Sequence, residues 1–381
     1  MAINERANAG VQEAINRSIS ERGEIGVQVA AYLDGELVID AWGGMADPDS
    51  GREVDGDTLF NVFSVTKAVV ATTIHIQAEQ GRLEYDEPIA RYWPEWGCNG
   101  KEDITVRDAL THHTGVPQMP DGTTVETICD WEFMVEGLAK LSPLLPRGKP
   151  AYQALSFGWI LGEIVRRTDP QHRPYARFIQ EELCQPLDIP DLWVGTPDAV
   201  AHRIATLSGS GSSGLAPADS LHAKALPYGV RLGPDVYKLP EVRRACIAAT
   251  GGIFTARSEA RFWAMLANGG ELDGVRLLSK ERVDAACVAR SGSDPDPVMF
   301  NATMRLSQGG YWLHDPKMPS SCAATGPRTI CVPGAGGSLG WADPDTRLAV
   351  AFCHNHMRPY PTCEEHPAFH VASAVRQSLG L

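Results

Sequence analysis

Strand-like runs near both ends of the chain constrain its fold more than any other feature of the sequence. Residues 25–33 and 36–42 are rich in apolar and β-branched side chains. The dipeptide Asp34-Gly35 between them is a two-residue hairpin signal, because Gly tolerates the positive φ that such turns need. Near the other end, residues 337–343 and 347–354 predict a second hairpin. Two hairpins so far apart in the chain favour one antiparallel sheet built from both chain ends.

Helical patterns flank these strands at both ends of the chain. Residues 4–20 carry apolar side chains near helical spacing and are followed by Gly23, which is a stop signal. Residues 367–379 predict a terminal helix. Because strands at both ends lie next to helices, we predict an α+β fold in which helices flank the sheet.

The middle of the chain has a different pattern. Short helical stretches alternate there with many Pro and Gly residues, and the clearest of them cover residues 106–110, 157–168 and 174–182. This pattern predicts a mostly helical domain, residues 86–240, inserted into a discontinuous sheet domain made of residues 1–85 and 241–381. Within the insertion, residues 208–214 (SGSGSSG) predict a surface loop or, alternatively, a lid over a substrate channel.

Charge and cysteine usage narrow the class of protein. The chain has 34 Lys and Arg against 47 Asp and Glu, a net charge of −13, which argues against binding to nucleic acid or to anionic membranes. No apolar run approaches the ~18 residues that a membrane helix requires. The N-terminus lacks the pattern of a secretory signal, and the nine cysteines are scattered without a CxxC pair. We therefore expect a cytoplasmic protein with reduced thiols.

Histidine spacing gives no support for a metal site. Neither His112-His113 nor the pair His354 and His356 has the spacing of a zinc ligand set, so no metal or other cofactor is expected. We expect His112-His113 instead to support the loop near the nucleophile described next.

The sharpest local signal for chemistry is Ser64-Val65-Thr66-Lys67. Apolar residues that follow it, up to Gly81, predict a buried helix that starts close to Ser64. Residues three apart share one helical face, so the Lys67 amine can reach the Ser64 hydroxyl. A desolvated amine that is neutral part of the time can take the proton of a serine, which is otherwise a poor nucleophile. The alternative is a capping serine beside a solvated lysine.

A second signal is Tyr152, which lies between a Gly- and Pro-rich approach and an apolar helical pattern. This context places the phenol on a turn at a helix start. A nearby lysine ammonium would lower the pKa of the phenol, so that Tyr152 could act as base towards Ser64 and as acid towards a leaving group. The alternative is a tyrosine that only packs in the core.

A third signal is the glycine cluster from Cys331 to Gly340, CVPGAGGSLG. It leads into a strand, and its small residues allow a ligand to approach the backbone closely. Its N–H groups could supply one donor of an oxyanion hole, with another from the helix start near Ser64. The alternatives are a simple bulge or turn. A phosphate-binding loop does not fit, because Ser338 enters a strand and no Gly-Lys-Ser/Thr ending is present.

In chain order, these segments resemble the serine β-lactamase and penicillin-binding-protein superfamily, in particular the class C β-lactamase-like branch that includes the family VIII carboxylesterases. The resemblance covers nearly the whole chain and includes the blocks LFNVFSVTKAVVA, LEYDEPIARYWPEW, ITVRDALTHHTGVP and GAGGSLGWADPDTRLAVAFCHN. Three ordered motifs with these flanks are far more specific than any single motif.

The resemblance implies a role for each matching residue. Ser64 would be the acylated nucleophile, Lys67 its activating partner and Tyr152 the general base and acid. The backbone N–H groups of Ser64 and Ala335 would form the oxyanion hole, and Gly334 would lie beside the acyl group.

Two departures from the family pattern bear on the substrate. Penicillin-recognising members follow the tyrosine with Ser-Asn, where this chain has Gln153-Ala154, and they carry Lys or His where it has Val332. An apolar side chain cannot pair with a substrate carboxylate, so a neutral ester or related acyl substrate is favoured. Trp341, which follows the glycine cluster, is a candidate wall of the acyl pocket, with packing as the alternative.

The sequence thus predicts a serine carboxylesterase that cleaves a small-molecule ester through an acyl-enzyme on Ser64. One alternative is an acyltransferase, which differs in passing the acyl group to an alcohol or amine instead of water. Another is a β-lactamase or D-amino-acid peptidase, which the two departures disfavour. The last is a non-catalytic binding protein, which Val332 favours and the intact Ser64, Lys67 and Tyr152 oppose.

Overall fold

One antiparallel sheet joins the two ends of the chain. The computed structural model describes residues 3–210, 216–292 and 294–381. In spatial order, the strands of the main sheet are β10 (Trp312–Leu313), β11 (Ile330–Pro333), β12 (Leu339–Asp343), β13 (Leu348–His354), β1 (Gly26–Leu33), β2 (Glu36–Asp47) and β3 (Arg52–Glu53). Ala30 of β1 lies opposite Ala351 of β13 on one side and Asp40 of β2 on the other. The predicted sheet from both chain ends is therefore confirmed.

Both predicted hairpins are present in this sheet. Asp34 and Gly35 connect β1 to β2 with φ values of 54° and 83°, as a two-residue turn between twisted strands requires. At the other end, β12 pairs with β13 from Asp343 opposite Leu348 onwards.

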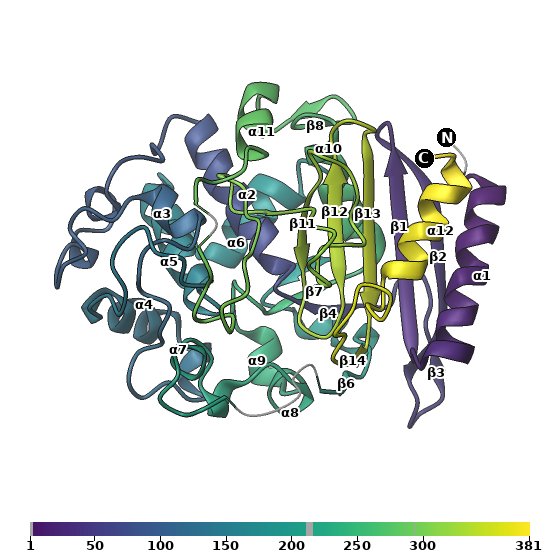
Figure 1. Cartoon of the computed structure of the whole chain (residues 1–381), viewed down its shortest axis with the longest axis horizontal. Helices are drawn as coiled ribbons and strands as arrows, with labels where there is room; N and C mark the ends of the chain where they lie inside the picture. Colours follow the sequence, from purple (N-terminus) through teal and green to yellow (C-terminus); the bar gives the residue numbers. More distant parts are fainter. Residues whose placement is uncertain (1–2, 211–215, 293) are drawn as a thin grey trace.

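Helices cover both faces of the sheet (Figure 1). On one face, α1 (Glu5–Arg22) and α12 (Phe369–Leu379) lie side by side, and α1 packs against Gly43 of β2 through Ile15. On the opposite face, α10 (Ala256–Ala267) packs against β12, β13 and β1. The side chain of Asn4 caps the start of α1, and the helix ends at the predicted stop, Gly23, which has a φ of 78°.

The remaining helices gather mainly on the side of the sheet where β11 lies, away from β2 (Figure 1). They are α2 (Thr66–Glu79), α3 (Val106–Leu110), α4 (Trp131–Lys140), α5 (Ser156–Thr168), α6 (Tyr175–Ile179), α7 (Leu221–Ala225), α8 (Pro234–Tyr237), α9 (Pro240–Arg244) and α11 (Lys280–Ala286). Short 3₁₀ turns occur at Ile89–Arg91, Pro94–Trp96, Thr127–Cys129, Asp198–Arg203 and Tyr228–Val230. The α+β fold with a helical insertion is confirmed, whereas the exact domain boundaries stay a prediction.

Small sheets complete the fold. Strands β4 (Phe60–Phe63), β7 (Gly252–Phe254) and β5 (Leu192–Val194) form one of them, so the largely helical insertion also contributes a strand. The others pair β8 (Glu271–Leu272) with β9 (Val275–Arg276), and β6 (Ser208–Gly209) with β14 (His356–Met357). Of the predicted loop at 208–214, residues 211–214 lie outside the described residues. The helix predicted at 174–182 is α6 followed by a π-helical turn at Gln180–Cys184.

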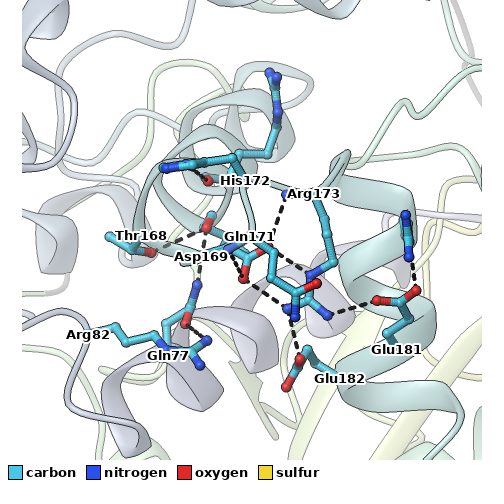
Figure 2. Close-up of polar contacts among 12 residues, drawn as sticks. Gln77, Arg82, Thr168, Asp169, Gln171, His172, Arg173, Glu181 and Glu182 are labelled. Atoms are coloured by element: carbon cyan, nitrogen blue, oxygen red, sulfur yellow. Dashed lines mark hydrogen bonds and ion pairs between the residues drawn. The ribbon is translucent and has the colours of Figure 1, made fainter.

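A hydrogen bond joins helices α2 and α5 near their C-terminal ends. The side chain of Gln77 in α2 donates to the carbonyl of Val165 in α5 at 3.1 Å. Just beyond α5, Asp169 forms a buried ion pair with Arg173, whose guanidinium also reaches Glu181 and Glu182 (Figure 2). The first contact joins α2, which carries Lys67, to α5, which follows Tyr152, and the second ties the end of α5 to the π-helical turn.

Among the helices of the described residues, we find none with the length and apolar character needed to cross a bilayer.

Candidate active site

Ser64 lies in the tight turn between β4 and α2, close to where the sequence predicts the helix to begin. Phe63, just before it, has a φ of 48°, a left-handed conformation that bulky residues rarely adopt. Thr66 holds this turn, because its hydroxyl donates to the Phe63 carbonyl at 2.5 Å and accepts from the Gly252 N–H at 2.9 Å. A strained backbone that is held in this way presents the Ser64 side chain in a fixed direction.

Lys67 is the second residue of α2, and its amine is enclosed by protein. Nζ lies 3.1 Å from Ser64 Oγ, 2.8 Å from the Ala154 carbonyl oxygen and 3.1 Å from that of Ala249. Gly158 of α5 permits the last contact, because a Cβ there would lie 2.3 Å from Ala249 N. Within the described part of the chain, the amine has no carboxylate partner.

Burial changes the protonation of this amine. It lowers the pKa of Lys67 from 10.5 to about 7, because the ammonium loses its hydration and gains no counter-charge. A neutral amine has two N–H donors and one lone pair. The two carbonyls accept the N–H bonds, which leaves the lone pair for the Ser64 hydroxyl. This arrangement suits transfer of the Ser64 proton to Lys67.

The phenol of Tyr152 also contacts the Ser64 hydroxyl, as the sequence predicts. Its phenol oxygen lies 3.4 Å from Ser64 Oγ, and its ring centroid lies 5.2 Å from Lys67 Nζ. The structure therefore brings Ser64, Lys67 and Tyr152 together. Ser64 and Tyr152 are each 7% exposed and Lys67 is 1% exposed, so all three are largely shielded from water.

The predicted lowering of the Tyr152 pKa is wrong. Burial raises the pKa of the phenol to about 12, the hydrogen bond with Ser64 opposes this rise, and the charge of Asp296 adds to it. The prediction assumed a charged lysine beside the phenol, whereas burial also moves Lys67 towards its neutral form. Tyr152 is therefore a protonated donor near neutral pH, able to give a hydrogen bond to Ser64 Oγ.

His112 and Asp296 hold the Tyr152 segment in place. The His112 carbonyl accepts from Ala151 N–H at 2.9 Å, and its Nδ1 accepts from Gln153 N–H at 3.1 Å. Asp296 Oδ2 accepts from the Tyr152 N–H at 2.8 Å. Burial lowers the pKa of His112 well below 6.5, so the ring stays neutral and can accept.

Sequence reasoning placed His112 near the nucleophile but missed Asp296 and Trp312. The Trp312 ring packs edge-on against the Tyr152 ring, with centroids 6.2 Å apart. Both residues lie far along the chain from Tyr152, and neither belongs to a recognisable motif. Only the HHTG signal around His112 could have pointed to this support.

The glycine cluster forms the turn between β11 and β12 and lies against β4, the strand that precedes Ser64. A Cβ on Gly334 would lie 2.3 Å from the carbonyl oxygen of Val62, so only glycine allows this approach to β4. The turn is closed by hydrogen bonds from Gly334 N–H to Ser338 and from Gly337 N–H to Gly334. The Ala335 N–H donates no hydrogen bond within the described residues, which leaves it available to a ligand.

Val332 and Trp341 lie on opposite faces of the sheet. Val332 is paired with Gly340, which faces Glu259 and Trp263 of α10, whereas the next residue, Trp341, points the other way. Both side chains are buried. No hydrogen bond or ring contact in the described residues joins Trp341 to the three clustered side chains, and its role as a wall of the acyl pocket stays a prediction.

The described residues contain no group of three or more His, Cys, Asp or Glu side chains arranged to hold a metal ion. The polar groups around Ser64 are an amine, a phenol and backbone N–H and C=O groups. Such a set can move protons and stabilise an oxyanion.

Comparison with known proteins agrees with this geometry. The model of the family described as Beta-lactamase matches residues 11–372. The chain belongs to this β-lactamase family. Its relatives include the esterase/beta-lactamase LipL of Mycobacterium tuberculosis, which is 34% identical over 90% of this chain and 80% of its own length.

Two solved structures resemble this chain over almost its whole length. A penicillin-binding-protein homologue from Caulobacter crescentus is 30% identical, with a TM-score of 0.86 over 99% of each chain. A family VIII carboxylesterase is 26% identical, with a TM-score of 0.88 over 99% of each chain. The resemblance predicted from the sequence is confirmed, and the chain is a hydrolase of the esterase/β-lactamase family.

Proposed function

We propose that this chain is a serine carboxylesterase that cleaves neutral small-molecule esters through an acyl-enzyme on Ser64. The observation that carries the proposal is the position of Ser64 Oγ, 3.1 Å from a buried amine and 3.4 Å from a protonated phenol. The esterase activity named for relatives such as LipL and the family VIII carboxylesterase supports the same reaction class.

In the acylation step, Lys67 takes the proton of Ser64 while Oγ attacks the ester carbonyl carbon. The N–H groups of Ser64 and Ala335 stabilise the tetrahedral oxyanion, which is usually worth a few kcal/mol. When the C–O bond breaks, the Tyr152 phenol gives its proton to the departing alkoxide, and Lys67 reprotonates the tyrosine.

In the deacylation step, water attacks the acyl-enzyme and gives its proton to the same pair of side chains. The carboxylic acid leaves and Ser64 Oγ regains a proton. Both steps use groups that already contact Ser64, so no rearrangement of the catalytic side chains is required.

Two departures from the family pattern favour an uncharged substrate. Val332 and Ala154 stand where penicillin-recognising relatives carry polar side chains, so a substrate carboxylate or amide would find no matching partner from either. This preference distinguishes an esterase from a β-lactamase in the same fold.

The test is hydrolysis of short-chain p-nitrophenyl esters and of the β-lactam nitrocefin by the wild-type protein, Ser64→Ala and Ser20→Ala. Ser20 is an exposed serine of α1 and is the matched control. We expect ester cleavage by the wild type and the control, none by Ser64→Ala, and little or no nitrocefin cleavage. Ester turnover that survives Ser64→Ala would refute the mechanism. Faster cleavage of nitrocefin than of esters would make the chain a β-lactamase, and product release only after addition of an alcohol would make it an acyltransferase.

A further inference from the structure

Two cysteine thiols contact the same short segment of chain, and the proposed ester chemistry uses neither. Cys322 lies in residues 314–329, which connect β10 to β11. Cys363 lies in residues 358–368, which connect β14 to α12. The two connections come from different parts of the chain, so the tertiary structure alone brings these thiols together.

Both sulfur atoms contact one short turn. Cys322 Sγ lies 3.2 Å from the carbonyl oxygen of Pro319, and Cys363 Sγ lies 3.5 Å from that of Pro316. Both thiols therefore lie against the same four residues, 316–319. All nine cysteines are free, so neither thiol is already part of a disulfide.

The two thiols differ in their access to solvent. Cys363 is partly exposed, whereas Cys322 is 6% exposed. Burial and the neighbouring Cys363 thiol raise the pKa of Cys322, so little of it is thiolate near neutral pH. A small reactant can therefore reach Cys363 more easily than Cys322. Cys363 would be the attacking thiol, and Cys322 would be the resolving thiol.

We propose that Cys322 and Cys363 form a reversible intramolecular disulfide by exchange with a small disulfide such as oxidised glutathione. The Cys363 thiolate attacks one sulfur of the small disulfide and releases one glutathione thiol. The Cys322 sulfur then attacks Cys363 Sγ, breaks the mixed disulfide and releases the second glutathione. Two protein thiols are oxidised and one glutathione disulfide is reduced to two thiols, and the two protein protons end on the released thiols.

The disulfide would tie together two segments beside the catalytic tyrosine. Tyr360 lies three residues before Cys363, and burial raises the pKa of its phenol, with smaller contributions from Cys322 and Tyr152. On the other connection, β10 begins with Trp312, whose ring packs against Tyr152. Fixing both segments would oppose the movement that a bulky acyl group needs at this site. This effect on turnover rests on the proposed function, whereas formation of the disulfide does not.

The test is incubation of the folded full chain with oxidised glutathione, followed by acid quenching and mass spectrometry of non-reduced peptides. The proteins are wild type, Cys322→Ser, Cys363→Ser and Cys129→Ser, the last being a partly exposed cysteine elsewhere and the matched control. In the wild type and the control we expect a peptide that links Cys322 to Cys363, reversed by dithiothreitol. Cys322→Ser should trap one glutathione on Cys363, and Cys363→Ser should form neither product.

A stable glutathione adduct on Cys363 in the wild type, a link between other cysteines, or no oxidation would each overturn the proposal. Closing a loop of about forty residues should also raise the unfolding temperature of the oxidised wild type by several degrees. In the oxidised form, kcat/KM should fall more for a bulky ester than for a short one and recover on reduction. If the linked peptide forms and turnover is unchanged, the proposed effect on the active site is refuted, while the proposed disulfide is retained. Absence of Ser64-dependent turnover in the reduced form would refute only the proposed function.

Discussion

The protonation of Lys67 makes a quantitative prediction about the pH dependence of ester cleavage. If only the neutral amine can accept the Ser64 proton, kcat/KM follows the neutral fraction of Lys67 in the free enzyme. With the pKa at about 7, this fraction rises from about one tenth at pH 6 to about nine tenths at pH 8. We therefore expect kcat/KM for a short ester to rise about tenfold over this range and then to level off.

The assay is the initial rate of p-nitrophenyl ester cleavage, followed at the isosbestic wavelength so that ionisation of the product does not distort the profile. Because the pKa of Tyr152 is raised to about 12, the phenol should add no second inflection between pH 6 and pH 9. A flat profile, or a midpoint near the ordinary lysine value of 10.5, would refute the reasoning.

The substitution Lys67→Arg tests the same point without changing pH. A guanidinium stays charged, so this variant should lose roughly 10²–10⁴ in kcat, the usual worth of acid–base help. The matched control is Lys101→Arg, because Lys101 is equally buried and its amine also contacts backbone carbonyls, those of Cys98 and Ala139 among them. The control should keep the wild-type pH profile, and near-normal kcat in Lys67→Arg would contradict the assigned role.

Three further predictions concern acid catalysis and stability. Tyr152→Phe should lower kcat by roughly 10²–10⁴ for alkyl esters. The loss should be smaller for p-nitrophenyl esters, because their leaving group needs little protonation. An equal loss for both kinds of ester would refute the role of Tyr152 as an acid. Burial raises the pKa of Glu259 from 4.5 to about 8, so the folded protein holds this proton more tightly than the unfolded chain does. The free energy of unfolding should therefore be highest below pH 4.5 and should fall as the pH rises towards 8. Thermal unfolding of Glu259→Gln should lack this fall, and parallel curves for the two proteins would contradict it. Arg173→Leu leaves the buried carboxylate of Asp169 unpaired and should cost about 3–5 kcal/mol in urea unfolding. The exposed control Arg17→Leu should change stability by less than about 1 kcal/mol, and similar values for both would show that the buried pair is not needed.

The local parts of the fold could be predicted because short-range physics determines them. Asp34-Gly35 sets the first hairpin through the positive φ of its turn, and Gly23 ends α1 for the same reason. The spacing of Ser64 and Lys67 on one helical turn fixes their contact wherever the helix lies. These features depend on residues within a few positions of one another, so the sequence carries them directly.

The properties of the site that depend on distant residues could not be read in this way. Asp296 accepts a hydrogen bond from the Tyr152 N–H although the two residues are 144 positions apart in the chain, and no sequence motif predicts this contact. The direction of the Tyr152 pKa shift was predicted wrongly, because a charge effect between neighbours is visible in the sequence while loss of hydration is not.

By itself, the sequence determined the identity of the reacting groups and the order in which they occur along the chain. Only the tertiary structure decided their protonation and their mutual distances. Enclosure by α2, α5 and the segment at Ala249 removes water from Lys67 and directs its lone pair to Ser64. The physical reason is that desolvation depends on everything that surrounds a group in space, and that surrounding is assembled from residues far apart in the chain.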